Sequence, residues 1–339
     1  MTLAIEVITD PTKIATLVPA WDALALRDPR SSPYDSGSLA IGLGGIVDPV
    51  VTTYVVTARR PDGELAGVLP LQRVPLNTRL GGHQLVGYTR WHTSYFDAVV
   101  DPGIPDVANA MLAALARRRD WEHCDLQFVR PDGNLYLATT EFARSEVAGS
   151  QLIHIDRTAG APDVCVTAHK TARRLAKAGT VEFTSAVTAE ALDETLQWFA
   201  ARHTDRWRDC GDSAEFSDPA AVQRLIDVMS EACRWGHGLV GTLRVSGELV
   251  AVHLAFRWRE TQYSWRMAHD ANWQHLSPGR LLFSLMIEDA FAAGCSSYDL
   301  GRGSEDYKHL WETTMRPLYR VTFAGQSWRA RLATLRRRG

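Results

Sequence analysis

The chain has 339 residues, which is long enough for two domains of ordinary size. Apolar residues make up 45% of it and charged residues 22%, a profile that excludes a disordered chain and indicates a packed globular protein. The net charge of −2 gives no overall field that favours nucleic acid or an anionic membrane, so such a partner would need a local basic patch.

Helix and strand signals alternate through the first half of the chain. We predict a helix over residues 10–27 and a hairpin of Thr52–Ala58 with Glu64–Leu71, closed by the turn Pro61-Asp62-Gly63. A strand, a helix and another strand are predicted next, at Tyr95–Val100, Asp106–Arg119 and Cys124–Val129. Helices mixed with hairpins indicate an α+β fold with mainly antiparallel sheets flanked by helices.

The second half repeats this order of elements. The predicted elements are helices at 166–178, 189–208 and 219–235, a hairpin of 239–245 with 248–258, a strand at 261–268, a helix at 277–293 and a strand at 297–300. The shared order indicates a weak internal duplication. We therefore predict two domains, residues 1–155 and 156–325, and a basic tail over 326–339, with the boundary region near Gly149–Ala161.

The start of the last predicted helix has the features of an anion site. Ser277 suits the N-cap and Pro278 the first helical position, while Gly279 would let a ligand approach the backbone. Arg280 adds a positive charge, and the first-turn N–H groups through Leu281 lie at the positive end of the helix dipole. The pattern predicts a phosphate or pyrophosphate site, although a capped helix that binds nothing has the same pattern.

A charged loop with two glycines follows the last predicted strand. Its candidate catalytic residues are Asp299, Glu305, Tyr307 and Lys308, and Arg302 is a candidate substrate-binding residue. Loops at strand ends are where a rigid scaffold holds reactive groups. A lysine there can stabilise an oxyanion or hold a phosphate, and a carboxylate can accept a proton from an attacking amine. A polar turn with a surface salt bridge is the alternative.

Two other segments carry candidate site residues. His253 shares a strand face with small alanines, which leaves room for it to line a cleft and act as a base near neutral pH. A hydrogen-bonded core histidine is the alternative there. At a predicted helix end, His203, Arg206 and Trp207 could frame an acceptor pocket, or they could belong to a solvated helix terminus.

Neither a metal centre nor a disulfide framework is indicated. The five cysteines are scattered and include no CxxC pair. The N-terminal residues lack a signal-peptide pattern, and nowhere do about 18 apolar residues run uninterrupted. We expect a cytoplasmic protein with reduced thiols, no metal, no membrane span and no obligate protein partner.

The segment from Val166 to Trp311 resembles the CelD-like acetyltransferase domain of the GNAT superfamily, which is related to the FemABX transferases. The matching pieces are His169-Lys170-Thr171-Ala172-Arg173-Arg174, Arg202-His203…Arg206-Trp207, Leu276-Ser277-Pro278-Gly279 and Tyr298–Lys308 followed by Trp311. The first half is similar to the usual N-terminal part through Trp21-Asp22-Ala23-Leu24, Ser32–Ser36 and Leu69-Pro70-Leu71. The resemblance implies tandem GNAT-like domains that share a cleft and transfer an acyl group to an amine.

The resemblance also implies a donor and roles for residues. Tyr307 and Lys308 match an aromatic–lysine pair that contacts the donor's terminal phosphate in FemABX relatives, and Glu305, Asp299 and His253 are the candidate proton acceptors, in that order. The usual Arg/Gln-x-x-Gly-x-Gly/Ala phosphate loop of acetyl-CoA-dependent GNATs is replaced by residues 277–280.

Three functions stay open at this point. The first is an N-acyltransferase that moves an acyl group from acyl-CoA to an amine of a small-molecule or saccharide acceptor. The second is an aminoacyl-tRNA-dependent former of peptide bonds, in which basic patches at 169–177 and 329–338 contact the tRNA backbone. The third is a non-catalytic module that binds a small ligand or a partner.

Overall fold

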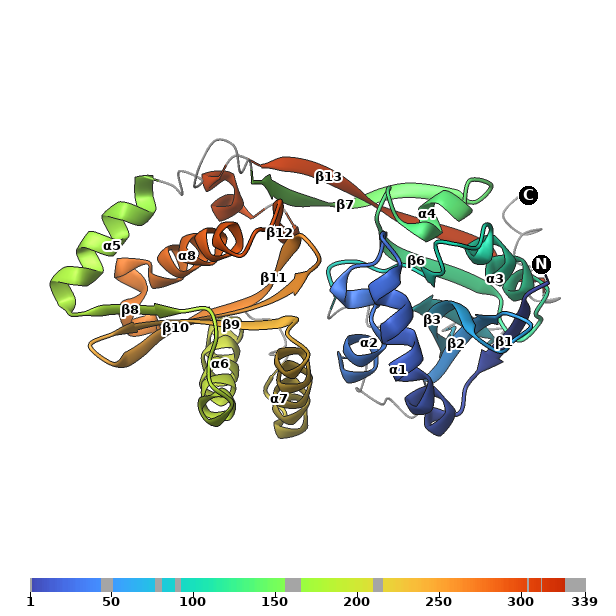
Figure 1. Ribbon diagram of the computed structural model, residues 1–339, viewed down its shortest axis with the longest axis horizontal. Coiled ribbons are helices and arrows are strands. Elements are labelled where there is room, and N and C mark those ends of the chain that lie inside the picture. Colours follow the sequence, from blue (N-terminus) through green and yellow to red (C-terminus); the bar gives the residue numbers. More distant parts are fainter. Residues whose placement is uncertain are drawn as a thin grey trace. The chain divides into compact units, whose positions relative to one another are not determined.

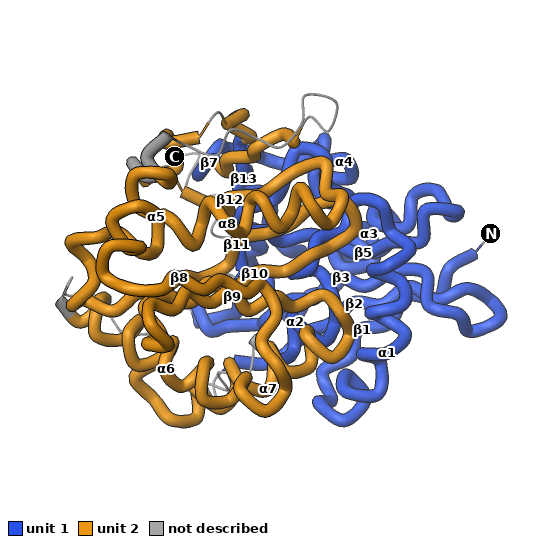
Figure 2. The backbone as a smooth tube through the Cα atoms, turned by 60° about the vertical axis from the view of Figure 1, so that its left-hand side comes forward, with its two compact units in different colours: residues 1–149, 317–339 blue, residues 150–316 orange. Residues whose placement is uncertain are grey.

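The computed structural model describes residues 2–43, 51–76, 81–88, 93–155, 166–209, 216–303, 305–311 and 313–326. The chain divides into two compact units, residues 1–149 with 317–339 and residues 150–316 (Figure 2). These units are divided after residues 149 and 316. The domain boundaries after residues 155 and 325 stay a prediction from the sequence. The arginines of the basic tail, Arg329, Arg331, Arg336, Arg337 and Arg338, lie outside the described residues.

Unit 1 is a mixed sheet with helices packed on it (Figure 1). The sheet order is β1-β2-β3-β4-β6-β13, with β5 beside β3. The strands are β1 (Ala4–Ile8), β2 (Thr52–Arg59), β3 (Leu65–Pro75), β4 (His83–Gly87), β5 (Val99–Val100), β6 (His123–Val129) and the end of β13 (Thr314–Ala324). The helices are α1 (Pro11–Arg27), η1 (Pro33–Asp35), α2 (Gly37–Leu43), α3 (Val107–Ala116) and α4 (Asn134–Ala138).

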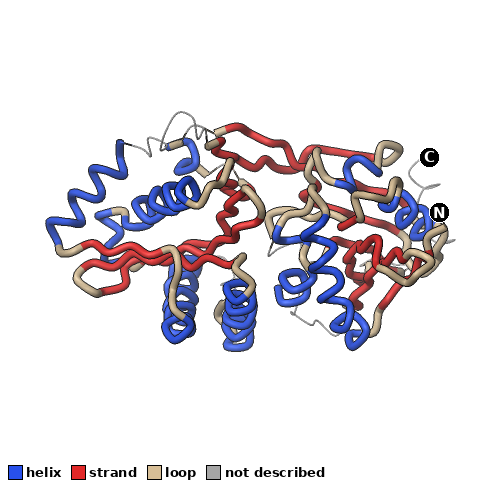
Figure 3. Tube along the Cα trace, viewed as in Figure 1, coloured by secondary structure: helices blue, strands red, loops and turns tan. Residues whose placement is uncertain are grey.

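Unit 2 has the same arrangement of strands and helices (Figure 3). Its sheet order is β8-β9-β10-β11-β12-β7. The strands are β8 (Val181–Thr184), β9 (Gly238–Val245), β10 (Glu248–Trp258), β11 (Thr261–His269), β12 (Ser297–Arg302) and the end of β7 (Ala143–His154). The helices are α5 (Val166–Ala178), α6 (Ala189–Asp209), α7 (Pro219–Arg234), η2 (Ala271–Leu276), α8 (Pro278–Ala292) and η3 (Asp306–Leu310).

Each sheet takes its last strand from the other half of the sequence. The strand β7, which follows β6 in the chain, pairs antiparallel with β12, so that Ile153 lies opposite Tyr298. The strand β13, which follows β12, pairs antiparallel with β6, so that Phe323 lies opposite Cys124. In each sheet one pair is parallel, β4 with β6 and β11 with β12, and a helix crosses between the two strands. This repeated topology confirms the predicted α+β fold with mixed, mainly antiparallel strand pairing.

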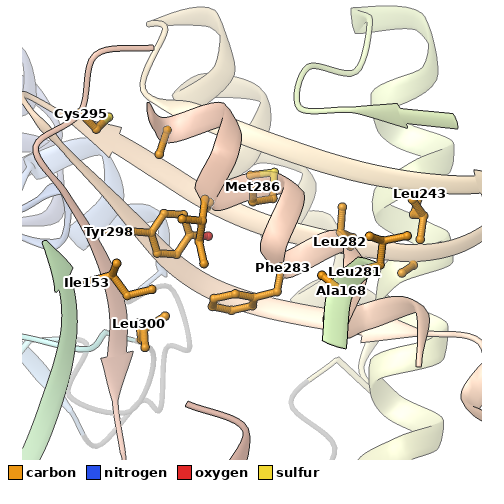
Figure 4. Close-up of a cluster of buried hydrophobic side chains, with 14 of the residues drawn as sticks. Ile153, Ala168, Leu243, Leu281, Leu282, Phe283, Met286, Cys295, Tyr298 and Leu300 are labelled. Atoms are coloured by element: carbon orange, nitrogen blue, oxygen red, sulfur yellow. The ribbon is translucent and has the colours of Figure 1, made fainter. Parts of the chain in front are cut away.

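The core of unit 2 positions the helix α8. Figure 1 shows α8 on one face of the sheet and α6 and α7 on the other. The side of α8 that faces the sheet is apolar, and Leu282, Phe283 and Met286 pack there against strand residues that include Leu243 and Tyr298 (Figure 4). Because this helix and the strands on either side of it share one close-packed core, the two ends of α8 have fixed positions relative to β11 and β12.

The predicted hairpins and long helices are confirmed. The β2–β3 and β9–β10 pairs are antiparallel, and the second turns at Ser246-Gly247, where both residues have positive φ values of 49° and 83° as a type I′ turn requires. The predicted helix over 10–27 is α1, and the Asp10 carboxylate accepts a hydrogen bond from the backbone N–H of Thr12 at 2.8 Å. The α5, α6, α7 and α8 helices also lie where the sequence predicts them.

One predicted strand is wrong over most of its length. Of Tyr95–Val100, only Val99–Val100 is strand. The preceding residues are buried, but their backbone groups do not continue the strand pairing. The N–H of Asp97, for example, donates to the Asp35 carboxylate at 3.1 Å. The Asp97 carboxylate itself accepts from the backbone N–H groups of Asn134 and Leu135, both at 2.7 Å, and so fixes the start of α4. Hydrogen bonds between the backbone and carboxylates from distant parts of the sequence replace strand pairing here.

Candidate active site

The strands β11 and β12 are paired only at one end. Their parallel register joins Thr261–Tyr263 to Ser297–Asp299, while β11 continues to His269 and β12 to Arg302 without further pairing between the two strands in the described residues. A β-bulge follows at once, since Leu254 lies opposite Arg266 but Ala255 lies opposite Ser264. Bulges are common next to active sites because they re-aim side chains and end strand pairing. The carboxyl ends of these strands therefore form a fork.

The helix α8 begins beside the open end of this fork. Ser277 has the N-cap position that the sequence predicts, but its backbone is left-handed with φ 54° and its side chain makes no capping hydrogen bond. The N–H of Arg280 donates to the Ser277 carbonyl at 3.1 Å. Pro278 has no N–H, so Gly279 carries the first-turn N–H that is left for a ligand.

Gly279 faces the last residues of β11. A Cβ atom at this position would lie 3.3 Å from the side chain of Met267 and 3.6 Å from Nδ1 of His269. The strand alternation puts these two side chains on one face of β11. A larger residue at position 279 would therefore press on the Met267 side chain, and His269 lies beside the positive end of the helix.

His269 is a polar group with an unused nitrogen at this helix start. Its Nδ1 atom is buried and has no hydrogen-bond partner among the described residues. Burial and then the positive charge of Arg206 lower the pKa of His269, whereas Asp270 raises it. Arg202, from the same end of α6, donates to the Asp270 carboxylate at 3.0 Å. Together these groups place cationic and N–H donor groups next to the fork.

Lys308 lies inside the loop that follows β12. Its ammonium group is 1% exposed and donates to the carbonyls of Arg302 at 2.7 Å, Gly303 at 3.3 Å and Gly301 at 3.4 Å. The Glu305 carboxylate, which is 55% exposed, pairs with the same ammonium at 2.8 Å. Three donors thus meet four acceptors. The two glycines have φ values of 73° and 108°, and the charge of Lys308 holds their carbonyls in this turn.

Asp299 is fixed by a buried ion pair. Its side chain is 1% exposed, and its carboxylate accepts from the N–H of Gly301 and from the guanidinium of Arg316, both at 2.8 Å. Arg316 also donates to the hydroxyl of Ser150 at 3.1 Å. The pair therefore ties the end of β12 to the neighbouring strand β7 and to the start of β13.

His253 lies in the layer between the unit 2 sheet and α8. The residue is 0% exposed, and its ring stacks on Phe283 with the centroids 4.9 Å apart and the planes at 23°. Its Nε2 atom is 2.9 Å from the hydroxyl of Ser264, and its Nδ1 atom has no partner among the described residues. Burial lowers the pKa of His253 to about 3, so the ring is neutral at ordinary pH.

The predicted acceptor residues lie at different depths. His203 is buried between Phe199 and Phe216, with ring centroids 5.5 Å and 5.1 Å away, whereas Arg206 is exposed near His269. The side chains of Trp207 and Tyr307 lie outside what the structure describes, although both residues belong to helices.

The structure groups the candidate residues into two sets. Arg302, Glu305 and Lys308 meet in the loop after β12, and Arg206 and Gly279 meet around His269.

Sequence reasoning missed several residues of this region. His269 and Met267 end a strand that leads into the predicted anion site, and their alternation could have placed them on the face toward α8. Ser264 and Arg316 had no signal of this kind, because their roles depend on the bulge in β11 and on the exchanged strand β7.

A basic helix borders the same region. The α5 residues Ala168 and Leu175 are buried in the core that includes α8. The opposite side of α5 exposes the cationic or titratable residues His169, Lys170, Arg173, Arg174 and Lys177. The guanidinium of Arg174 donates at 3.0 Å to the carbonyl of His275, three residues before α8 begins. The positive face of α5 is thus anchored beside the start of α8.

The described residues contain no group of three or more His, Cys, Asp or Glu side chains that could hold a metal ion. Their helices include none with the length and apolar character needed to cross a bilayer.

Comparison with known proteins identifies a transferase domain in unit 2. Residues 167–309 match the family model described as an acetyltransferase (GNAT) domain. None of the curated proteins compared with this chain is a significant match.

Solved structures share the fold over nearly the whole chain. The crystal structure of FemX has a TM-score of 0.62 and 11% identity, and the match covers 93% of this chain and 96% of that one. The C-terminal domain of a putative lysylphosphatidylglycerol synthetase from Agrobacterium fabrum has a TM-score of 0.59 and 14% identity, with coverage of 95% and 96%. The L-PGS structure from Bacillus licheniformis gives 0.59 and 13%, with coverage of 97% and 96%. At these identities the likeness shows a common fold.

Proposed function

We propose that this chain, an acyltransferase of the GNAT fold, moves an acyl group from acyl-CoA to the amine of a small-molecule or saccharide acceptor. The observation that carries the proposal is the β11–α8–β12 fork, which lies within the segment that matches the acetyltransferase family. Strands that separate leave backbone N–H and C=O groups for an extended ligand, and a helix that starts at the same end can hold the ligand's phosphate.

The charges around the fork suit the pyrophosphate of CoA. The N–H of Gly279 and the dipole of α8 provide the backbone part of an anion site. His269 brings a nitrogen that has no partner in the described residues, and Arg206 brings a positive charge that contributes to the lowered pKa of His269. A phosphate oxygen bound here would accept from N–H groups and lie near the positive charge of Arg206.

The reaction itself is an exchange of bonds at the thioester carbonyl. The amine nitrogen attacks the carbonyl carbon and forms the C–N bond. The C–S bond then breaks, and CoA leaves as its thiolate. The proton that the amine loses needs an acceptor in the site. Among the candidates, Glu305 is the half-exposed carboxylate, whereas Asp299 is engaged with Arg316 and His253 is a fully buried neutral ring. We assign Glu305 as the acceptor and Lys308 as the residue that holds its loop.

A second candidate donor is aminoacyl-tRNA, which the resemblance to FemABX transferases implies. The exposed cationic face of α5 favours it, because a helix with five such residues can neutralise several phosphates of a nucleic-acid backbone. Two solved structures that share the fold of this chain are named FemX and a putative lysylphosphatidylglycerol synthetase, and these names fit an aminoacyl donor. The similarity to this chain is one of fold.

Calorimetric titration with acetyl-CoA, together with native mass spectrometry for co-purified CoA or RNA, tests the proposal. We expect micromolar binding of acetyl-CoA, weakened about tenfold by Arg206→Ala and by His269→Leu, which is about 1.4 kcal/mol each. Arg208→Ala is the matched control, since Arg208 is an exposed cation of the same helix that pairs with Asp205 at 3.4 Å. No binding of acetyl-CoA, with tight tRNA binding that collapses in added salt, would replace the first donor by the second.

A further inference from the structure

Ser264 lies at the point where the fork opens. It is the first residue of β11 beyond the three that pair with β12, and the bulge follows it directly. Its side chain is almost buried, and its hydroxyl is 2.9 Å from Nε2 of His253 on the adjacent strand β10. A ligand that enters between β11 and β12 and extends to the paired ends of the strands meets Ser264 at its inner limit.

His253 is a polar residue among aromatic rings, in the layer between the unit 2 sheet and α8. It stacks on Phe283, and Phe283 in turn contacts the rings of Tyr298 at 5.6 Å and Trp311 at 4.9 Å between centroids. A polar ring in this aromatic layer leaves Nδ1 buried without a partner in the described residues, which costs stability. An apolar residue would avoid this cost, so a structural role alone does not account for the histidine.

The properties of His253 and Ser264 suit the selection of a polar ligand group. Burial keeps His253 neutral, so that it orients the Ser264 hydroxyl without adding a charge. The rings of Tyr298 and Trp311 lie against Phe283, on which the His253 ring stacks, with centroids 5.6 Å and 4.9 Å from that of Phe283. The inner limit of the fork thus combines one oriented hydroxyl group with a neighbouring cluster of aromatic rings.

We propose that Ser264, positioned by His253, contacts the acyl group of the donor and selects short acyl chains that carry a hydroxyl or amino substituent. The inference rests on the proposed function, because it requires the donor to lie in the fork. A site that hydrogen-bonds a polar substituent discriminates strongly against the analogue that lacks it. Ser264 is then a specificity-determining residue and His253 a positioning residue that acts through it.

The test compares the affinities of lactyl-CoA and propionyl-CoA, which differ by one hydroxyl group, in calorimetric titrations of the full chain. We expect the parent protein to bind lactyl-CoA about tenfold more tightly, as one added hydrogen bond gives. Ser264→Ala and His253→Leu should reduce this ratio to within about twofold, while Ser264→Thr should keep it because the hydroxyl remains. His253→Gln should restore part of it, since an amide can still orient the hydroxyl.

Thr261→Val is the matched control. It removes the bond between the hydroxyls of Thr261 and Ser297, at 2.8 Å, which joins the same two strands at their paired end. We expect the affinity ratio of this variant to equal that of the parent. The ratio compares two ligands on one protein, so a loss of folded protein does not change it.

The outcomes separate this inference from the proposed function. If the parent binds both acyl-CoA esters but shows no preference, or if Ser264→Ala retains the preference, the role of Ser264 is wrong and the proposed function stands. If the parent binds neither ester, the acyl-CoA donor and the role of Ser264 fail together.

Discussion

Replacing Lys308 by methionine should destabilise the chain because it removes the buried ammonium group that binds the carbonyls of the loop after β12. The bond from the ammonium to the Arg302 carbonyl, at 2.7 Å, is short, while those to Gly303 and Gly301, at 3.3 Å and 3.4 Å, are near the long limit for hydrogen bonds. A hydrogen bond to a charged group contributes about 1.5–3 kcal/mol. One strong and two weak bonds give an expected loss of about 3 kcal/mol in the free energy of unfolding.

The ion pair with Glu305 adds little to this sum. Because the glutamate is 55% exposed, the pair is screened by solvent and contributes under about 1 kcal/mol. The variant Glu305→Gln therefore serves as the control for stability, with an expected loss below about 1 kcal/mol. The two substitutions together separate the contribution of the buried carbonyl hydrogen bonds of Lys308 from that of its exposed ion pair with Glu305.

Urea unfolding followed by tryptophan fluorescence measures both effects, since the chain has 11 tryptophans and Trp311 lies just after η3. The midpoint for Lys308→Met should fall by about 1–3 M for a slope of about 1–3 kcal/mol/M, with the slope itself unchanged. A loss below about 1 kcal/mol together with a hundredfold fall in turnover would refute the loop-holding role. Lys308 would then be a catalytic cation, as the sequence resemblance suggests.

Three further predictions concern other parts of the chain. Arg316→Leu should cost about 3 kcal/mol in unfolding free energy by leaving the carboxylate of Asp299 buried without its cation, and adding Asp299→Asn should recover most of that loss. Burial, and then the charge of Asp35, raise the pKa of Asp97 to about 8, so the folded chain holds more protons than the unfolded chain between about pH 4 and 8. Stability should therefore fall as pH rises through that window in urea titrations, and Asp97→Asn should flatten the slope; a parent slope of opposite sign would contradict the assignment. Ser277→Gly should raise the free energy of unfolding by about 1 kcal/mol because the position is left-handed, whereas a loss of stability would show that the hydroxyl caps α8 after all.

The sequence predicts the elements with strong local patterns. The long helices and the hairpins follow from apolar periodicity and from turn residues such as Ser246-Gly247, which act over a few positions. The strands β1, β4, β8 and β13 escape prediction. The structure gives a reason for β13, which pairs with β6 from the other half of the sequence, and no local pattern encodes such a pairing.

The candidate site divides in the same way. The positions of Gly279 and Lys308 at a helix start and in a strand-end loop follow from local sequence. Their contacts do not, because Lys308 binds the carbonyls of its own loop and Gly279 packs on Met267 from β11. Ser264 and His269 come into view only once the fork between β11 and β12 is known, since their importance depends on where the strands separate.

The exchange of β7 and β13 has a consequence for biosynthesis. The sheet that contains β1 to β6 gains its final strand only when the ribosome has made residues up to Ala324, so β6 presents an open edge during most of translation. The half that is made first must therefore wait for the half that is made last.

Cutting the gene between the halves would not yield two independent proteins. Each fragment would carry a strand that belongs to the other fragment's sheet and would lack one of its own. Two domains that each contain all their own strands can be produced separately. Two domains that exchange a strand depend on each other to complete their sheets.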